Sequence, residues 1–494
     1  MEEKKGAEFK IPTHSTPSRN SVAQGGLRPA KERHNGGAPA RLTLPPHTMC
    51  FTEAARMANT LQTTCCIVGG GPAGVMLGYL LARKGVNVTV LERHKDFFRD
   101  FRGDTVHPST LELMYELGIL EEFLAVPHQE LRSISGVVGG YSFKVADFTR
   151  VPTHCKFVAL MPQWDFLNFL SERAREFRGF DLRLEYEATD LLRENGKIVG
   201  VVAQTPEGPV EISADLVVAC DGRHSTMREA AKLPLTEFGV PMDVLWFGIG
   251  RRANDPERSF GSLNYGRALV LINRREYFQA GLIIRKGSFE EMKAAGMEAF
   301  RETVARIAPY LGDRVHELQS WDEIKLLTVK LNRLERWHEP GLLCIGDAAH
   351  AMSPAGGVGI NLAIQDAVAT ANLLSDELRE RRVTAELLGR VRCRREFPTR
   401  ITQAAQANAH KLFGELFRHT GPVQAPWQLK TVVGIPGITH VIGRAVGIGV
   451  RPEHIKDARR SSAYRRHQVA KVALGMGIAA GVLLVCRGLR GARG

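Results

Sequence analysis

The sequence predicts an α/β fold in which a parallel sheet carries helices, an antiparallel sheet is inserted, and helices complete the chain. Three observations lead to this prediction. A buried strand, an amphipathic helix and a second strand follow one another within residues 65–92. Alternating apolar runs occupy residues 243–285, as antiparallel strands with hairpin turns would. Residues 361–418 carry a mostly helical pattern.

The parallel sheet is expected to begin with CCIVGG, an uninterrupted apolar run from Cys65 that is typical of a strand buried on both faces. GVMLGYLLARKG follows as an amphipathic helix closed by a glycine, and VNVTVLER is the next strand. The remaining predicted elements are helices at 109–125, 162–177 and 289–310, and strands at 216–220, around 324–331 and within GLLCIGDAAH.

The composition is that of a globular protein with a core, since 44% of the 494 residues are hydrophobic and 24% are charged. The net charge of +13 lies at the two ends, because residues 57–450 hold 47 basic and 46 acidic residues. We therefore expect no nucleic acid partner. The eight cysteines show neither metal-ligand spacing nor a paired framework, which predicts reduced thiols and a cytoplasmic protein.

A glycine-rich loop follows the first predicted strand, and each of its residues has a physical task. Gly69 permits the tight turn, Gly71 lets a pyrophosphate approach the backbone, and Gly74 lets helix and strand pack closely. Pro72 and Ala73 open a helix whose positive end faces the phosphates. Glu92 ends the second strand, where its carboxylate can accept hydrogen bonds from ribose hydroxyls. The loop predicts a dinucleotide site.

A second glycine-rich loop, in GDAAHAMSPAGGVGINLAIQDA at 346–367, indicates which dinucleotide is bound. Asp347 is predicted at a strand end, where its carboxylate could bind the hydroxyls of a ribityl chain, which FAD has and NAD lacks. The glycines at 356, 357 and 359 lead into a helix whose free N–H groups would stabilise the negative charge of a reduced isoalloxazine ring. One extended FAD spanning both loops explains why the chain carries two.

Three blocks together resemble the single-component flavoprotein monooxygenases, the family of para-hydroxybenzoate hydroxylase. They are the GxGxxG loop, a DG motif in ACDGRHSTMR at 219–228, and a GD motif in GDAAHAMSP at 346–354. The resemblance covers roughly residues 65–375. It implies an FAD-binding, Rossmann-like domain of the glutathione-reductase type, with an inserted antiparallel substrate-side sheet and C-terminal helices.

The resemblance also implies roles for individual residues. An arginine after the second strand would contact the FAD phosphates, a helix-start glutamine would lie near the flavin, and a proline would line the ring side that faces substrate. The complete predicted cofactor-binding set is Gly69, Gly71, Pro72, Ala73, Gly74, Glu92, Arg93, Arg102, Gln163, Asp221, Gly222, Gly346, Asp347, Pro354, Gly357, Val358, Gly359, Ile360 and Asn361.

No catalytic residue is assigned from the sequence, and Pro354 and His350 are the pocket candidates. Several residues keep two interpretations. His350 is either an acid–base group or a packed family feature, and Arg228 either organises the DG turn or touches substrate. His107 is either a turn residue or part of the pocket lining. The aromatics at predicted strand positions divide between core and pocket wall; they are Trp246, Phe247, Tyr277 and Phe278.

The expected domain boundaries follow the motifs and the shifts in composition. Residues 1–56 lack apolar periodicity and predict a disordered extension, interpreted as a regulatory segment, a weak targeting arm or the product of an upstream start. The FAD-binding domain is assigned to 57–235 and 336–375, the inserted sheet to 236–335, the helical segment to 376–450, and a basic tail to 451–494.

An uncharged stretch at 472–486 lies inside the basic tail, between Lys471 and Arg487. It is shorter than the ~20 residues that a membrane-spanning helix needs. Two interpretations stay open: a packed C-terminal helix, or a peripheral membrane contact in which the flanking cations meet anionic headgroups.

The resemblance implies hydroxylation of an aromatic or quinol-like small molecule. NADH or NADPH, bound transiently, would reduce the FAD, and dioxygen would form a flavin C(4a)-hydroperoxide that delivers one oxygen atom. One alternative is an FAD-dependent reductase or dehydrogenase of the prenyl-reductase type, which transfers no oxygen. Another is a non-catalytic, membrane-associated flavoprotein. A halogenase is disfavoured because the expected lysine and tryptophan motif after the first loop is absent from the sequence.

Overall fold

The computed structural model describes residues 60–98, 105–253, 255, 260–274, 276–419 and 421–456, all within one compact unit, 55–494. The predicted extension at 1–56, the apolar stretch at 472–486 and Arg102 lie outside the described residues. No helix in the described ranges is long and apolar enough to cross a membrane. The predicted fold class, an α/β protein with a parallel sheet, an antiparallel sheet and C-terminal helices, is confirmed.

The larger sheet has eight strands, and its central path runs in the order β19-β20-β11-β1-β2-β8. The strands from β20 to β8 are parallel, whereas β19, β9 and β10 pair antiparallel to their neighbours. The strands are β1 (Thr60–Val68), β2 (Val88–Glu92), β8 (Phe180–Leu184), β9 (Glu187–Glu194), β10 (Lys197–Thr205), β11 (Gly208–Ala219), β19 (His338–Glu339) and β20 (Leu342–Cys344).

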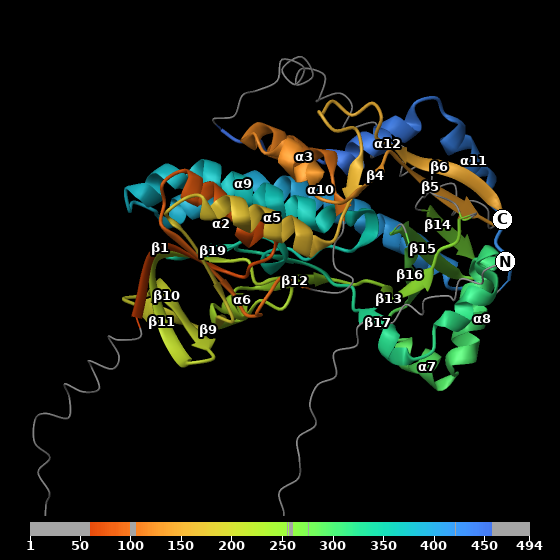
Figure 1. Ribbon diagram of the computed structural model, residues 1–494, viewed down its shortest axis with the longest axis horizontal. Helices are drawn as coiled ribbons and strands as arrows, with labels where there is room; N and C mark the ends of the chain where they lie inside the picture. The colour runs from red at the N-terminus through yellow and green to blue at the C-terminus, as the bar shows by residue number, and fades with distance from the viewer. Residues whose placement is uncertain are drawn as a thin grey trace, which may run out of the picture. The chain divides into compact units, whose positions relative to one another are not determined.

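The last five residues of β1 are buried because strands flank β1 on both sides and helices cover it. The helices that contribute to this core include α2 (Pro72–Arg83), α3 (Pro108–Leu117), α5 (Gln163–Arg175) and α9 (Val358–Arg379). Figure 1 shows α2 and α9 lying side by side. Pro72 occupies the first turn of α2, where a missing N–H costs nothing.

The second sheet has seven strands in the order β17-β13-β16-β15-β14-β5-β6. All its pairings are antiparallel except that of β14 with β5. Its strands are β5 (Ser133–Val138), β6 (Tyr141–Asp147), β13 (Met242–Gly250), β14 (Phe260–Asn264), β15 (Arg267–Asn273), β16 (Tyr277–Arg285) and β17 (Lys325–Leu327). Two strands therefore come from residues 133–147, inside the range that the sequence assigns to the FAD-binding domain.

The two faces of this sheet bury different partners. In β13, Leu245 and Phe247 pack with α7 (Phe289–Ala294) and α8 (Met297–Ile307), which lie against the sheet in Figure 1. Val244 and Trp246 face the opposite side, where Met352 and α10 (Ala385–Leu416) contribute apolar side chains. The period of two along β13 separates these two clusters.

Smaller elements connect the sheets. A three-stranded sheet joins β3 (Thr105–Val106), β7 (Val158–Leu160) and β4 (Gln129–Leu131), and a two-stranded sheet joins β12 (Leu235–Phe238) to β18 (Leu331–Leu334). The remaining helices are α4 (Leu120–Ala125), α6 (Thr226–Ala230), α11 (Trp427–Gly434) and α12 (Ile438–Gly447), with 3₁₀ turns at Pro309–Glu317, Trp321–Glu323, Gly346–Ala348 and Ala355–Gly357.

Two predicted helices are each broken in the structure. The one expected at 109–125 is α3 followed by α4, because Gly118 ends α3 in the left-handed region, with φ 79°. The one expected at 289–310 is α7 followed by α8, interrupted at Gly296, with φ 91°. A periodic apolar pattern continues across both breaks, so the period alone does not reveal them.

Gly443 lets α12 lie directly on β6, since a Cβ there would come 2.0 Å from the carbonyl oxygen of Asp147. Gly443→Ala should therefore lower the free energy of unfolding by about 1–3 kcal/mol, the usual cost of overpacking. Urea denaturation measures this. Gly414→Ala on α10 is the control, because a Cβ there meets no described atom within 4 Å. Equal effects of the two substitutions would contradict this account of the α12 contact.

Candidate functional site

Four parallel strands end at one edge of the larger sheet and bring the predicted motifs together. Val68 at the end of β1 is level with Ala219 of β11 and Leu91 of β2, and Ala219 is level with Cys344 of β20. The GxGxxG loop, the DG motif and the GD motif follow three of these strand ends, and Glu92 ends the fourth. Ligands of open α/β sheets bind at this edge.

The first loop is shaped by its glycines. Gly69 has φ 105°, and a Cβ on it would lie 2.5 Å from the Cys220 carbonyl oxygen. A Cβ on Gly74 would lie 2.0 Å from the carbonyl oxygen of Gly69. Gly71 immediately precedes α2, and a Cβ on it would meet no described atom within 4 Å. The backbone is thus closely packed at two glycines and open to a ligand at the third.

Glu92 closes the other side of this loop. One of its carboxylate oxygens accepts the Gly70 N–H at 3.1 Å, and the other accepts the His94 N–H at 3.1 Å. Arg93, in contrast, has a 59% exposed side chain whose guanidinium is 3.8 Å from the carboxylate of Glu187 on β9. Glu92 therefore adjoins the loop, whereas Arg93 pairs with β9.

The helices α2 and α9 run parallel, with their N-termini toward the same edge. Gly346 separates them at one end, where its Cβ would be 3.1 Å from that of Ala363 and 3.4 Å from that of Ala73. At the other end Gly85 approaches Arg379. Ala363 lies five residues into α9, so α9 starts about 7 Å beyond this contact. Two positive helix ends are thus staggered along one side of the molecule.

The second loop is held from the side of β3. Gly356 and Gly357 have φ 80° and 63°, and Thr105 Oγ1 donates to the Gly357 carbonyl at 3.1 Å. Asn361 accepts from the N–H of His107 and the hydroxyl of Thr110, and donates to the carbonyls of Thr105 and Gly357. Its side-chain amide is fully used, so Asn361 positions the loop, and the backbone of Val358, Gly359 and Ile360 is what the helix start offers to a ligand.

Three polar residues of α10, Gln403, Gln406 and His410, hold the segment before this loop through hydrogen bonds that the sequence did not predict. Gln406 exchanges hydrogen bonds with Ser353, accepting its N–H at 3.1 Å and donating to its carbonyl at 2.9 Å. His410 Nε2 is 2.9 Å from the Ser353 hydroxyl, and Gln403 donates to the Asn332 carbonyl at 2.7 Å. Glutamines and a histidine spaced three and four apart in a long helix are a signal that could have indicated this contact.

The two aspartates of the DG and GD motifs lie in different environments. Asp347 is 29% exposed, and its carboxylate is 3.4 Å from the Arg223 guanidinium. Asp221 accepts the Met227 N–H with one oxygen, while its other oxygen is buried without a partner among the described residues. Burial raises the pKa of Asp221. A buried, unpaired carboxylate oxygen at this edge indicates a missing donor.

Arg228 joins the two motifs, and its partners are backbone groups. It is 5% exposed and donates to the carbonyls of Ala348 and Arg223, at 3.0 and 3.1 Å. These contacts favour the interpretation that Arg228 organises the DG turn.

His350 is buried rather than placed at a pocket. It is 1% exposed, its Nε2 is 2.6 Å from Asp366, and its ring lies 4.9 Å from that of Trp337. These contacts favour packing over an acid–base role. Pro354 is half-buried and immediately precedes the 3₁₀ turn before α9. Gln163 begins α5, three residues after Leu160, which pairs with Thr105.

The aromatics divide by the face of the second sheet. Phe247 and Phe278 are fully buried in the cluster under α8, whereas Trp246 is half-buried on the side of Met352 and Tyr277 is 43% exposed. Adjacent residues of a strand thus differ in burial, because successive side chains point to opposite faces of the sheet.

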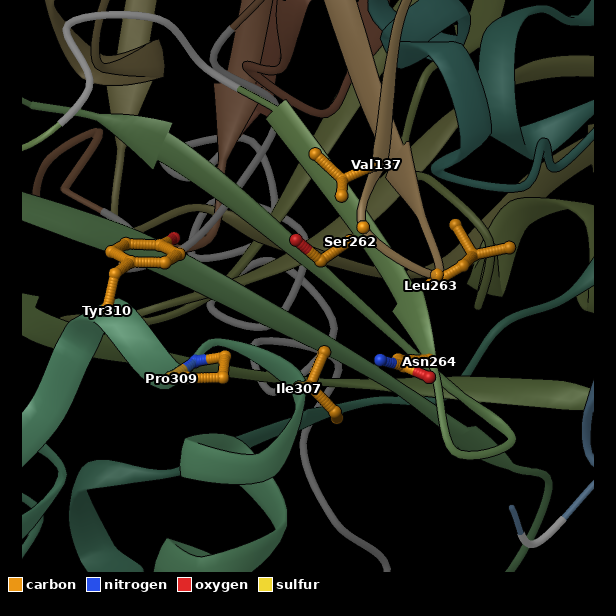
Figure 2. A pocket seen from close by; sticks show the side chains of 9 residues that line it. Val137, Ser262, Leu263, Asn264, Ile307, Pro309 and Tyr310 are labelled. Carbon is orange, nitrogen blue, oxygen red and sulfur yellow. The ribbon is translucent and has the colours of Figure 1, made fainter. Parts of the chain in front are cut away.

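A cavity of about 370 Å³ lies between the strands β5 and β14 and the end of α8 (Figure 2). Val137 and Ser262 pair in neighbouring strands and point to the α8 side, where Ile307, Pro309 and Tyr310 complete the wall. Ile307 belongs to the cluster under α8, whereas Leu263, which also lines the cavity, packs with the cluster that holds Met352. None of the lining residues belongs to the glycine loops or to the DG and GD motifs.

The arrangement fits one extended dinucleotide better than two short ligands. An open glycine backbone, the carboxylate of Glu92 and two staggered helix starts lie along one edge, with the half-buried carboxylate of Asp347 among them. Residues 62–405 match the family model described as "FAD binding domain". The chain belongs to this family. The match identifies FAD as the dinucleotide of the domain.

Relatives of the chain in this family include flavin-dependent oxygenases. The 6-methylpretetramide 4-monooxygenase of Streptomyces rimosus is 32% identical over 340 residues, which cover 68% of this chain and 81% of that protein. The predicted resemblance to the single-component FAD-dependent monooxygenases is thereby confirmed, and by family this FAD protein is such a monooxygenase. The dialkyldecalin synthase of Streptomyces rugosporus is 30% identical over 62% of this chain and 64% of that protein.

Two solved structures agree with the fold. The Diels-Alderase PyrE3 superposes with a TM-score of 0.62 at 25% identity, covering 79% of this chain and 80% of that one. The p-nitrophenol 4-monooxygenase PnpA of Pseudomonas putida DLL-E4 gives a TM-score of 0.62 at 18% identity, covering 79% and 94%. The second likeness concerns the fold alone.

His107 provides a pH-dependent test of the second loop. Burial lowers the pKa of His107 from 6.5 to about 4. Below pH 6.5, His107 therefore binds a proton in the unfolded chain but stays neutral in the folded protein. The free energy of unfolding should fall between pH 6.5 and 4, and His107→Gln should remove roughly 2–3 kcal/mol of that fall. Denaturation at several pH values measures it. His419→Gln, at an exposed position, is the control substitution. A His107→Gln profile parallel to wild type would refute the pH dependence that we assign to the burial of His107.

Proposed function

We propose that this protein takes electrons from NADH or NADPH and uses FAD and dioxygen to hydroxylate an aromatic or quinol-like small molecule. The observation that carries the proposal is the parallel, staggered pair of helix starts at α2 and α9. Each offers free N–H groups and a positive dipole end, one for a diphosphate and one for a flavin ring that becomes negative on reduction.

The proposed placement of FAD follows from the contacts along the sheet edge. Gly71 and the start of α2 would take the diphosphate, and Glu92 the ribose of the adenosine half. Asp347 would bind ribityl hydroxyls, and Val358 to Ile360 would face the ring edge. When bound and reduced, FAD supplies the activation of dioxygen.

The chain's own contribution is orientation. Asn361 and Thr105 hold the second loop from one side, and Gln406 and His410 hold its preceding segment from the other. A loop fixed at both ends keeps its N–H groups aimed at one position, which lowers the cost of stabilising charge there.

Substrate would bind between the second loop and the face of the antiparallel sheet that carries Val244, Trp246 and Ile283. Met352 packs on this same face and lies two residues before Pro354. These side chains are apolar, and Trp246 Nε1 is buried without a partner among the described residues, so it is a candidate donor to a substrate oxygen. Relatives named for 6-methylpretetramide and anhydrotetracycline support a fused-ring phenolic substrate.

The hydride donor would approach beside Asp347. Arg223 and Lys330 are the cations there, and burial together with these two charges lowers the pKa of His224, so that His224 itself adds no positive charge near pH 7. Cations at a surface of this kind suit the diphosphate of a transiently bound NADH or NADPH.

A second candidate function is a cyclisation that needs no oxygen transfer. It is favoured by the relatives named dialkyldecalin synthase and Diels-Alderase, which share the fold and part of the sequence. The reductase alternative is tested by the same measurement of product formation with and without dioxygen. Peripheral membrane contact through 451–494 stays a separate prediction.

The cofactor placement predicts the effect of Asp347→Ala. Loss of a charged acceptor should weaken FAD binding by at least about tenfold, since hydrogen bonds to charged groups are worth roughly 1.5–3 kcal/mol. Titration of the apoprotein with FAD, followed by flavin fluorescence, measures the dissociation constant. Asp313→Asn, at a 76% exposed position, is the control. Wild-type affinity in the Asp347 variant would exclude this placement.

The reaction is tested by screening phenolic polyketides for stimulated oxidation of NADH or NADPH, with hydrogen peroxide measured in parallel. We expect product whose new oxygen comes from ¹⁸O₂, and no product without dioxygen. Product formed anaerobically with consumption of the nicotinamide would instead indicate a reductase. Anaerobic product formed without that consumption would indicate a cyclase.

A further inference from the structure

A short segment beyond the family match closes over three helices. We call residues 452–456 the C-terminal strap. Glu116 of α3 accepts the Ile455 N–H at 2.8 Å, and Asn372 of α9 donates to the His454 carbonyl at 2.8 Å and accepts the Lys456 N–H at 3.1 Å. Ile455 itself is 3% exposed. The strap is thus bonded on both sides and packed, although the family match ends at residue 405.

Glu453 brings a buried carboxylate into this strap. Its side chain is 3% exposed and accepts hydrogen bonds from Arg394 at 2.7–2.9 Å, with Arg395 Nη1 at 3.5 Å. The Glu453 N–H bonds to the side-chain oxygen of Gln365 on α9. A carboxylate buried this deeply requires the compensating cations, because an uncompensated charge in the interior is costly.

Arg395 lies between Glu453 and Asp366, and Asp366 in turn contacts the GD motif. It is 1% exposed and donates from Nε to Asp366 Oδ1 at 2.8 Å. The other oxygen of Asp366 accepts the Gly346 N–H at 3.1 Å and contacts His350 at 2.6 Å. Burial opposes ionisation of Asp366, but His350 and Arg395 outweigh it and hold its pKa below the usual range. With one oxygen held by Arg395, the other is directed at the residue before Asp347.

We propose that the C-terminal strap positions the Gly346–Asp347 turn for FAD through Glu453, Arg395 and Asp366, which makes Glu453 a positioning residue of the cofactor site. The inference rests on the proposed placement of FAD at Asp347. Glu453 touches no part of that placement, so its effect passes through Arg395. Without its carboxylate, Arg395 loses one of two buried anions and is drawn more strongly to Asp366, which alters the acceptor for Gly346.

The experiment compares Glu453→Gln with Glu377→Gln. The first removes the buried charge at nearly constant volume, and the second removes a 32% exposed carboxylate of α9 that pairs with Arg382. FAD is titrated into each full-length apoprotein, and the thermal midpoint of each apoprotein is recorded separately. We expect the FAD dissociation constant to rise roughly tenfold in Glu453→Gln and to stay at the wild-type value in Glu377→Gln.

The same FAD titration of Arg395→Met, and of the double variant that carries Glu453→Gln and Arg395→Met, tests whether the effect of Glu453 passes through Arg395. If the effect passes through Arg395, the Glu453→Gln change should add little to the FAD dissociation constant once Arg395 is gone. Should Glu453→Gln fail to fold, Glu116→Gln loosens the strap at its other end while leaving Glu453, Arg395 and Asp366 in place. It should also weaken FAD binding.

The outcomes separate the two levels of inference. A lower thermal midpoint with unchanged FAD affinity in Glu453→Gln overturns the strap's positioning role and leaves only a structural one. Additive effects of the Glu453 and Arg395 changes overturn the route. Normal affinity in Asp347→Ala overturns the cofactor placement itself, whereas lost affinity there with normal affinity in Glu453→Gln refutes the strap alone.

Discussion

The close approach of α2 and α9 at Gly346 is the constraint on which the cofactor edge depends. A Cβ at that position would lie 3.1 Å from the Cβ of Ala363 and 3.4 Å from that of Ala73, so a side chain there would crowd the contact. Gly346 also has φ 60°, a conformation that glycine adopts at little cost. This contact lies near the starts of the two helices, where both sets of free N–H groups are presented.

Local sequence was sufficient to predict the parts of the site that lie next to strand ends. The first loop was recognisable because its glycines occur at the spacing that a strand, a tight turn and a helix require, and Glu92 stands at the end of the next strand. The structure brings this loop, Asp221, Asp347 and the start of α9 to one edge. The positions follow from the strand register, and their roles toward FAD remain predictions.

Hydrogen bonds between residues far apart in the sequence leave no periodic pattern, and the sequence analysis did not predict them. Thr105 and Gly357 are bonded across 252 positions, and Gln406 reaches Ser353 across 53. The strands β5 and β6 join a sheet whose other members lie about a hundred residues later. His350 illustrates the reverse case: its motif left both an acid–base role and packing open, and its buried contact with Asp366 favours packing.

The order of the strands has a consequence for how the protein is made. The central strand β11 lies between β1 and β20, so the middle of the parallel sheet is incomplete until residues 342–344 have joined it. The start of α9 follows them, and Glu453 comes later still. The FAD site that we propose is therefore complete only after the residues up to Glu453 have been synthesised and folded. With that placement, a nascent chain stalled before β20 would lack the sheet edge at which FAD is proposed to bind.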